Sequence, residues 1–216
     1  MNFEQARFNM VEQQVRTWEV LDPKVLDVLS EVPREAFVPE SAQGLAYADT
    51  QIPLGHGEKM MPPVVEARMV QALNIQISDS ILEVGTGSGY VTALLAKLGH
   101  HVDSMDIVED FIKSAEQRLD AQGIRNVALE ASDATRNFGG RHYDAIAITA
   151  SLPVMEEKYQ QLLSVGGRMF VIVGEAPVME AMLITRIGET EFRHESLFET
   201  CIDELKNTTQ PQQFEF

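Results

Sequence analysis

The residues with the clearest chemical meaning in this sequence form a glycine-rich turn that follows an apolar segment. The apolar segment ends at Glu83, and glycines follow at alternate positions, Gly85, Gly87 and Gly89. Glycines allow a sharp turn and let a ligand approach the backbone without meeting a Cβ atom. A helix that starts directly after such a turn directs N–H groups at it. The pattern predicts a nucleotide-type site at the carboxyl end of a strand.

The spacing of the glycines narrows the choice of ligand. The dinucleotide fingerprint is G-x-G-x-x-G, whereas here the third glycine comes one residue early. With an acidic residue before the turn, the pattern resembles motif I of the class I S-adenosylmethionine (AdoMet) methyltransferases. AdoMet carries an amino acid end and a ribose but no pyrophosphate, so acidic groups and a close backbone suit it. We expect AdoMet to be bound by Glu83, Gly85, Thr86, Gly87 and Gly89; a tight loop without a ligand is the alternative.

Two aspartates follow later apolar segments. Asp106, next to Ile107, comes about 20 residues after the turn, where a ribose-binding acid ends the second strand of such folds. Asp133, next to Ala134, follows a third short strand, and the resemblance to AdoMet enzymes implies that it holds the adenine amino group. A solvated loop aspartate is the alternative for Asp106, and a helix N-cap is the alternative for Asp133.

Composition limits the classes of function. The 216 residues carry a net charge of −16, which repels nucleic acid and anionic membranes. Cys201 is the single cysteine, so no intrachain disulfide can form, which suits a reducing cytoplasm. The first residues lack the features of a signal peptide, and no apolar run approaches the ~20 residues that span a bilayer. The five histidines lack metal-ligand spacing, so we expect no metal.

The elements that must position these residues follow from periodicity. Helical periodicity extends from 3 to 32, a loop rich in glycine and proline covers 44–63, and a helix is expected over 64–74. We expect residues 1–75 to form an N-terminal helical extension with a substrate loop. Residues 76–216 are expected to form the AdoMet-binding domain, the two parts making one compact unit.

After residue 80, strands and helices alternate. The expected strands are 80–84, 101–105, 126–130, 143–150 and 168–173, and the expected helices are 89–98, 108–122 and 153–163. Two segments near 181–187 and 192–202 are typical of a closing hairpin. The sequence therefore predicts an α/β fold with a doubly wound, mostly parallel, Rossmann-like methyltransferase sheet and a C-terminal hairpin.

More specific motifs precede the glycine turn: Pro33-Arg34-Glu35-Ala36-Phe37-Val38-Pro39, Tyr47-Ala48-Asp49 and Ile52-Pro53-Leu54-Gly55. Their order resembles that of the protein-L-isoaspartate O-methyltransferases, and the similarity covers nearly the whole chain. The resemblance implies methyl transfer from AdoMet to the isoaspartyl carboxylate of damaged proteins or peptides. The resulting ester collapses to a succinimide that can reopen to normal aspartate.

The substrate loop departs from that family's pattern. The family usually has Gly-x-Thr-Ile-Ser-x-Pro, whereas here Lys59 stands at the threonine and Met61 at the serine. We expect Asp49, Lys59 and Met61 to border the methyl acceptor, although Asp49 can equally cap a turn and Lys59 can be a solvated lysine. AdoMet binding should survive the change. The alternative functions are a methyltransferase for another acceptor and an AdoMet-binding protein without turnover. An NAD oxidoreductase is the weakest alternative. The sequence leaves the oligomeric state open.

Overall fold

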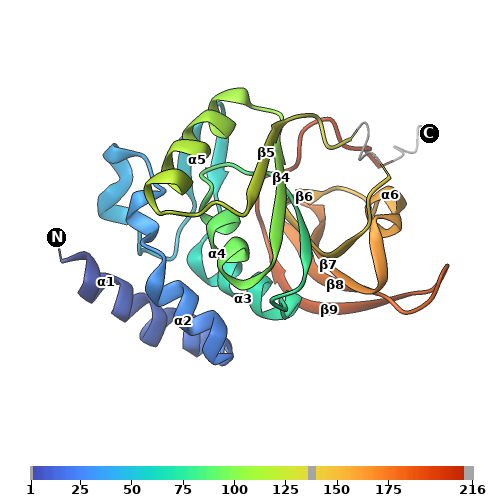
Figure 1. The fold of residues 1–216 in the computed structure, drawn as a ribbon, viewed down its shortest axis with the longest axis horizontal. Helices are drawn as coiled ribbons and strands as arrows, with labels where there is room; N and C mark the ends of the chain where they lie inside the picture. Colours follow the sequence, from blue (N-terminus) through green and yellow to red (C-terminus); the bar gives the residue numbers. More distant parts are fainter. Residues whose placement is uncertain (1, 136–139, 212–216) are drawn as a thin grey trace.

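The structure, a computed structural model, describes residues 2–135 and 140–211. Within them, seven strands form one mixed sheet in the order β5-β4-β3-β6-β7-β8-β9 (Figure 1). The first five strands in this order are parallel, and β8 and β9 form an antiparallel hairpin after them. The strands are β3 Ser80–Val84, β4 His101–Asp106, β5 Val127–Ala131, β6 Tyr143–Leu152, β7 Leu163–Glu175, β8 Val178–Arg186 and β9 Phe192–Thr200.

The predicted fold class is confirmed, and the strand sequences explain it. Central parallel strands are buried on both faces and therefore consist mainly of apolar residues. Successive side chains of β3 point to opposite faces of the sheet, so that Ile81 joins one hydrophobic cluster and Leu82 the other. The chain order reverses at β3, which lies between β4 and β6. This reversal is where open α/β sheets bind ligands, outside the carboxyl ends of the strands.

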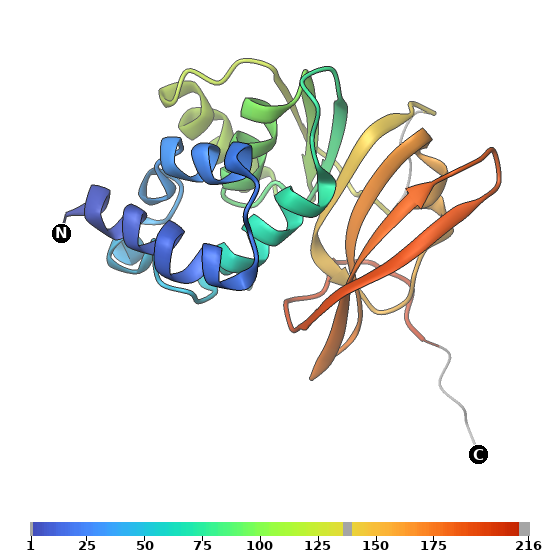
Figure 2. The same cartoon turned by 90° about the horizontal axis from the view of Figure 1, so that it is seen from below.

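Helices cover mainly one face of the sheet, as the view in Figure 2 shows. The helices that carry the site are α3 Pro63–Leu73, α4 Tyr90–Leu98 and α5 Glu109–Ala121. The helix expected over 153–163 is shorter, with α6 limited to Glu157–Gln161. Leu163 already begins β7 and pairs with Tyr143 of β6, so strand pairing ends this helix early.

The N-terminal region is helical but interrupted. Its elements are α1 Phe3–Asn9, a π-helix Met10–Val15, a 3₁₀-helix Arg16–Trp18 and α2 Pro23–Glu31. Glu19, with a φ of 62°, ends the first helical run, and Asp22 caps α2 by accepting a hydrogen bond from the Lys24 N–H. Pro23 takes the first position of α2, as predicted.

The segment 44–63, predicted as loop, contains a small antiparallel hairpin, β1 Ile52–Gly55 and β2 Glu58–Met60. Its turn contains three successive residues with positive φ, from Gly55 to Gly57. Ile52 pairs with Met60, and both side chains are buried. Burial of one apolar residue from each short strand stabilises the hairpin. The sequence indicated a loop here because the segment is rich in glycine and proline.

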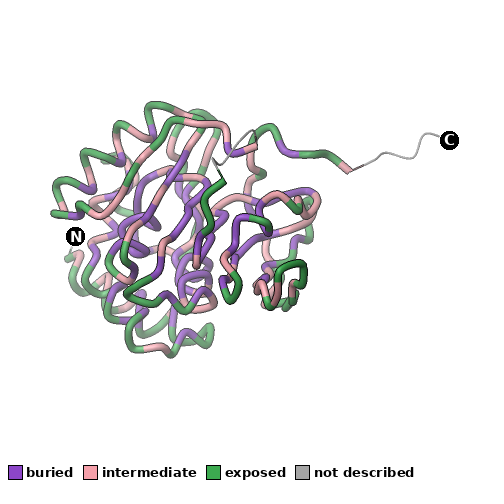
Figure 3. Tube along the Cα trace, turned by 45° about the vertical axis from the view of Figure 1, so that its right-hand side comes forward, coloured by how far each residue is buried: buried purple, intermediate pink, exposed green. Residues whose placement is uncertain are grey.

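Buried residues occupy the interior on both sides of the sheet (Figure 3). One cluster joins residues of the N-terminal helices, such as Met10 and Leu29, to sheet residues such as Phe170. The division into two parts at residue 75 stays a prediction. No helix in the described part of the chain has the length and apolar character needed to span a bilayer.

Candidate active site

A cavity opens at the carboxyl ends of β3, β4 and β6, where the chain order reverses. Its walls come from regions far apart in the sequence, among them the glycine turn, the end of β4, the segment after β5, and the β1–β2 hairpin. The lining residues include Gly85, Thr86, Gly87, Asp106, Ile107, Phe111, Asp133, Ala134, Thr149, Lys59, Met60 and Met61. The cavity therefore joins most of the residues expected at the cofactor to two of the three expected at the methyl acceptor.

The amide groups of the glycine turn are largely engaged within the protein. The N–H groups of Gly85 and Thr86 donate to the Met105 carbonyl at 2.8 and 3.2 Å, and the Gly87 N–H donates to Asp106. The Gly89 N–H donates to the Thr86 carbonyl at 2.8 Å. A pyrophosphate needs several amides that point outward. The turn therefore presents a close backbone surface rather than a phosphate cradle.

Asp106 is fixed at the end of β4 by two backbone hydrogen bonds. One carboxylate oxygen accepts from the Gly87 N–H and the other from the Val108 N–H, each at 2.9 Å. Burial raises the pKa of Asp106, although both hydrogen bonds oppose that shift. A carboxylate has about four lone-pair sites, so each oxygen can accept one further hydrogen bond from a ligand hydroxyl.

Asp133 lines the same cavity from the segment after β5, and Thr149 lines it from β6. The Asp133 carboxylate accepts from the Thr135 N–H at 2.9 Å and from the Asn207 side-chain amide at 3.0 Å. The pairing of β6 with β7 shifts between Ala147 and Ser151. This irregularity lies where Thr149 and Ala150 line the cavity, and such shifts re-aim side chains.

Glu83 lies beneath the cavity and does not line it. Its side chain is fully buried, and one oxygen accepts from the hydroxyls of Thr92 and Ser104. The Ser104 hydroxyl in turn bonds that of Thr86 at 2.7 Å, which connects the carboxyl group to the glycine turn. Burial raises the pKa of Glu83 to about 8, so the carboxyl group is mainly protonated at neutral pH.

The β1–β2 hairpin forms the second wall of the cavity. Met60 and Met61 are both buried and supply apolar surface, whereas the Lys59 side chain is 43% exposed. The ammonium group of Lys59 is 2.9 Å from the carboxylate of Asp203. Lys59 also lines a second cavity, with Gln51 and Ser151, so this residue contributes to the walls of both cavities.

The segment after β9 closes one side of the cavity. The Ser151 N–H donates to the Asp203 carbonyl and the Leu205 N–H donates to the Ser151 carbonyl, each at 2.9 Å. Leu205 and Lys206 line the cavity, and Lys206 pairs with Glu58 of β2 at 2.5 Å. No pattern in the sequence indicates these contacts, because they join residues from about 50 to about 150 positions apart.

Three of the predicted site residues lie outside the cavity lining: Glu83, Gly89 and Asp49. Gly89 is the N-cap of α4 and packs against α5, since a Cβ atom there would be 3.0 Å from that of Ala115. Asp49 is exposed on the segment before β1. Leu54, Phe111 and Thr149 were not identified as site residues from the sequence. Thr149 could have been found, because it lies near the carboxyl end of a central strand, beside the glycine turn.

Among the described residues, no group of three His, Cys, Asp or Glu side chains is arranged to hold a metal ion. The hydrogen-bond acceptors on the cavity lining instead suit an organic molecule with hydroxyl and amino groups. The acidic residues on the lining include Asp106 and Asp133, which lie there together with apolar side chains such as Phe111 and Val91. Such a mixture of apolar surface and a few fixed polar groups is typical of a cofactor site.

Comparison with known proteins adds to this geometry. Residues 5–202 match a family described as protein-L-isoaspartate(D-aspartate) O-methyltransferase. A protein-L-isoaspartate O-methyltransferase from Rhodopseudomonas palustris is 38% identical over 190 residues, which are 87% of this chain and 87% of that protein. A second, from Pelobacter propionicus, is 36% identical over 91% of this chain and 88% of that protein.

Solved structures share the fold. A Plasmodium falciparum protein described as a protein-L-isoaspartate O-methyltransferase, crystallised with S-adenosyl-L-homocysteine, superposes with a TM-score of 0.79 at 20% identity. The match covers 96% of this chain and all of that chain. A structure described as a protein-L-isoaspartate O-methyltransferase superposes with a TM-score of 0.80, also at 20% identity, over 94% of this chain and 67% of that one.

Proposed function

The chain belongs to the protein-L-isoaspartate(D-aspartate) O-methyltransferase family, whose members depend on AdoMet, and from this premise we propose that it methylates the isoaspartyl carboxylate of damaged proteins. The observation that carries the proposal is the single cavity that joins the glycine turn to the β1–β2 hairpin. A cofactor held at the turn would face an acceptor admitted beside Lys59 and Met61.

The residues on the lining fit AdoMet. Asp106 would accept from the ribose hydroxyls, beside Ile107, and Asp133 with Ala134 would hold the adenine end. Gly85, Thr86 and Gly87 offer backbone surface to the amino acid end, while Glu83 and Gly89 shape the turn from outside the cavity. The cofactor, when bound, supplies a methyl group on a sulfonium, which a carboxylate oxygen can take as the carbon–sulfur bond breaks.

The protein's own contribution is alignment rather than proton transfer. A carboxylate acceptor is already ionised at pH 7 and needs no general base. Catalysis can then depend on holding the carboxylate oxygen about 3 Å from the methyl carbon. Lys59, oriented by Asp203, would attract the acceptor carboxylate, and the buried Met60 and Met61 would exclude water. We place the protein in the cytoplasm, which cell fractionation would test.

A different methyl acceptor is the alternative that a specific observation favours. Met61 is buried in the cavity lining and presents a thioether where the family pattern has a serine hydroxyl. A protein that binds AdoMet without turnover is the alternative from outside the enzymes. The first would form a different methylated product, and the second would form no product.

The decisive experiment measures transfer of labelled methyl from AdoMet to an isoaspartyl peptide, with the same peptide carrying normal aspartate as the control. Label in the isoaspartyl peptide alone, with stoichiometric S-adenosylhomocysteine, is the expected result. S-adenosylhomocysteine formed only with other acceptors would favour a different substrate. Cofactor binding without any product would favour the non-catalytic alternative.

A further inference from the structure

Arg34 is a fully buried guanidinium between the N-terminal region and the cavity. It begins a 3₁₀-helix, Arg34–Ala36, and its side chain donates to three different segments. The Nη1 group donates to the Ala46 carbonyl and the Nη2 group to the Met61 carbonyl, each at 2.6 Å. The Nε and Nη2 groups together hold Glu66 of α3 at 3.0 and 3.1 Å.

The partners of Arg34 surround the acceptor side of the cavity. Met61 and Glu66 both line the cavity, and Ala46 lies at the start of the segment that leads into β1. The guanidinium also lies 5.4 Å from the ring centroid of Tyr90, the first residue of α4 after the glycine turn. Arg34 therefore joins the end of the β1–β2 hairpin, here called the acceptor hairpin, to α4, the helix that follows the glycine turn.

Stability alone gives a poor account of this arrangement. Burying two charges is costly, and well-packed apolar residues often replace a buried ion pair without loss of stability. A planar guanidinium differs from an apolar side chain in fixing several acceptors at defined angles. The Met61 carbonyl has Arg34 as its partner just before Pro62 and Pro63, neither of which has an N–H group.

We propose that Arg34 is a positioning residue for methyl transfer, which fixes the Met61 end of the acceptor hairpin relative to the glycine turn. The proposal rests on the proposed function, since it concerns the acceptor side of the same cavity. Arg34 does not line the cavity and so acts through Met61. Loss of the planar guanidinium should displace the side of the cavity formed by Met61. It should leave Asp106 and the rest of the cofactor side in place.

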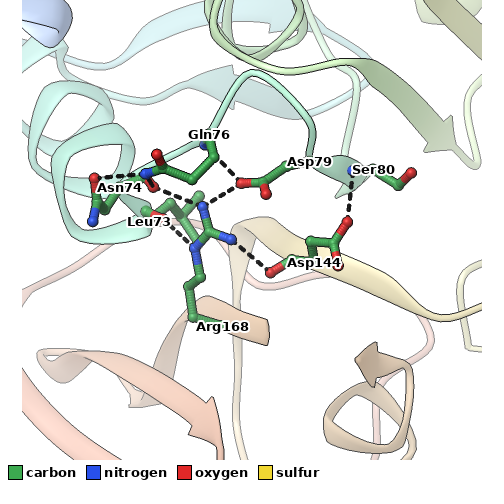
Figure 4. A network of polar contacts seen from close by, with 7 residues as sticks. All are labelled: Leu73, Asn74, Gln76, Asp79, Ser80, Asp144 and Arg168. Atoms are coloured by element: carbon green, nitrogen blue, oxygen red, sulfur yellow. Dashed lines mark hydrogen bonds and ion pairs between the residues drawn. The ribbon is translucent and has the colours of Figure 1, made fainter. Parts of the chain in front are cut away.

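Arg168 offers a matched control elsewhere in the protein. Its guanidinium donates to the carbonyls of Leu73, Asn74 and Asp144 and pairs with Asp79 (Figure 4). The Asp144 end of β6 is opposite to the end at Thr149 that lines the cavity. A lysine at either arginine keeps the charge but loses the planar fork, so the two substitutions make equivalent chemical changes in different places.

The test compares Arg34→Lys with Arg168→Lys. Because a displacement of about 1 Å can cost on the order of 100-fold in rate, Arg34→Lys should lower kcat/KM for an isoaspartyl peptide by roughly that factor. Its dissociation constant for S-adenosylhomocysteine, measured by calorimetry, should stay at the wild-type value. Arg168→Lys should leave both quantities unchanged, whatever its effect on stability.

Hydrogen exchange gives a second readout that does not depend on activity. Amides of segment 58–61 should exchange faster in Arg34→Lys, and those of segment 85–89 should not. Three results would each overturn the proposal. Arg34→Lys could weaken S-adenosylhomocysteine binding as much as it lowers kcat/KM, or it could leave exchange at 58–61 unchanged. Arg168→Lys could also show the same loss of kcat/KM. If Arg34→Lys does not fold, the isosteric Glu66→Gln, which removes the carboxylate that orients the fork, must accelerate exchange in the same segment. If the wild-type protein methylates no isoaspartyl peptide, the proposed function fails, and the exchange result still decides whether Arg34 fixes segment 58–61.

Discussion

The hydroxyl of Thr149, at the end of β6, occupies the space beside Gly85 in which a side chain would begin. A Cβ atom on Gly85 would be 2.3 Å from the Thr149 Oγ1 atom. That hydroxyl donates to the carbonyls of Val84 and Gly85, at 3.0 and 2.6 Å. Position 85 therefore requires glycine for two reasons: its φ is +98°, and the neighbouring strand leaves no space for a Cβ atom.

Substitution of Gly85 separates these two requirements. Gly123 also has a positive φ, +71°, but a Cβ atom there would meet nothing within 4 Å. Gly123→Ala should therefore lower the free energy of unfolding by about 1–2 kcal/mol, the cost of the left-handed backbone alone. Gly85→Ala should cost about 1–3 kcal/mol more, because the clash forces neighbouring atoms to move. Urea denaturation measures both.

A double-mutant cycle identifies the source of the extra cost. Adding Thr149→Ala to Gly85→Ala removes the clashing hydroxyl, so the excess over Gly123→Ala should largely disappear. Equal effects of the two single glycine substitutions would contradict the steric argument.

Replacing Asp106 with asparagine should weaken cofactor binding. The amide nitrogen would face a backbone N–H donor, since both carboxylate oxygens accept from the backbone, and the negative charge would be lost. Hydrogen bonds to a charged group contribute about 1.5–3 kcal/mol, so affinity for S-adenosylhomocysteine should fall about 10- to 100-fold. Calorimetry measures the change, with Asp120→Asn as control, because Asp120 is an exposed residue of α5 outside the cavity lining. Unchanged affinity in Asp106→Asn would remove this residue from the cofactor site.

Stability should fall as pH rises toward 8, and Glu83 should account for part of the fall. Burial raises its pKa from the ordinary value to about 8, so between these values the folded state holds a proton that the unfolded state has released. The free energy of unfolding therefore decreases with rising pH in this range. Each pH unit corresponds to at most about 1.4 kcal/mol, so Glu83→Gln should lose about 2 kcal/mol less than the wild type between roughly pH 6 and 8.

We expect part of the remaining slope in Glu83→Gln to come from Glu66. Burial also raises the pKa of Glu66, to about 7, against the opposing charge of Arg34. Chemical denaturation at several pH values gives the slopes. Identical slopes for the wild type and Glu83→Gln would show that Glu83 ionises in the folded protein as it does in water.

Lys59 tests the acceptor side of the proposed site. Lys59→Gln removes the charge beside Asp203 and should raise KM for an isoaspartyl peptide by up to about fivefold, since an exposed ion pair contributes at most about 1 kcal/mol. Lys59→Arg keeps the charge and should stay near the wild-type value. The difference between the two variants should shrink with added salt, which screens exposed charges. A KM that Lys59→Gln leaves unchanged would support a solvated lysine without a role.

Much of the fold could be predicted from the sequence because its signals are local. The segments that became β3 and β6 are mainly apolar, as buried parallel strands require, and the strand expected over 80–84 was found at Ser80–Val84. The interrupted N-terminal helix and the β1–β2 hairpin were missed. Their boundaries depend on pairing and packing with distant residues, such as Ile52 with Met60.

The sequence by itself determined the type of site: a glycine turn, an acid at Asp106 and an acid at Asp133, each at the end of a strand. These positions follow from chain order, because parallel strands bring their carboxyl ends to one edge of the sheet. Only the tertiary structure decided which side chains face the cavity. It placed Glu83 beneath the turn, Thr149 against Gly85, and Lys59 beside Asp203. Such contacts depend on side-chain direction and on segments up to about 150 residues apart, which no local pattern encodes.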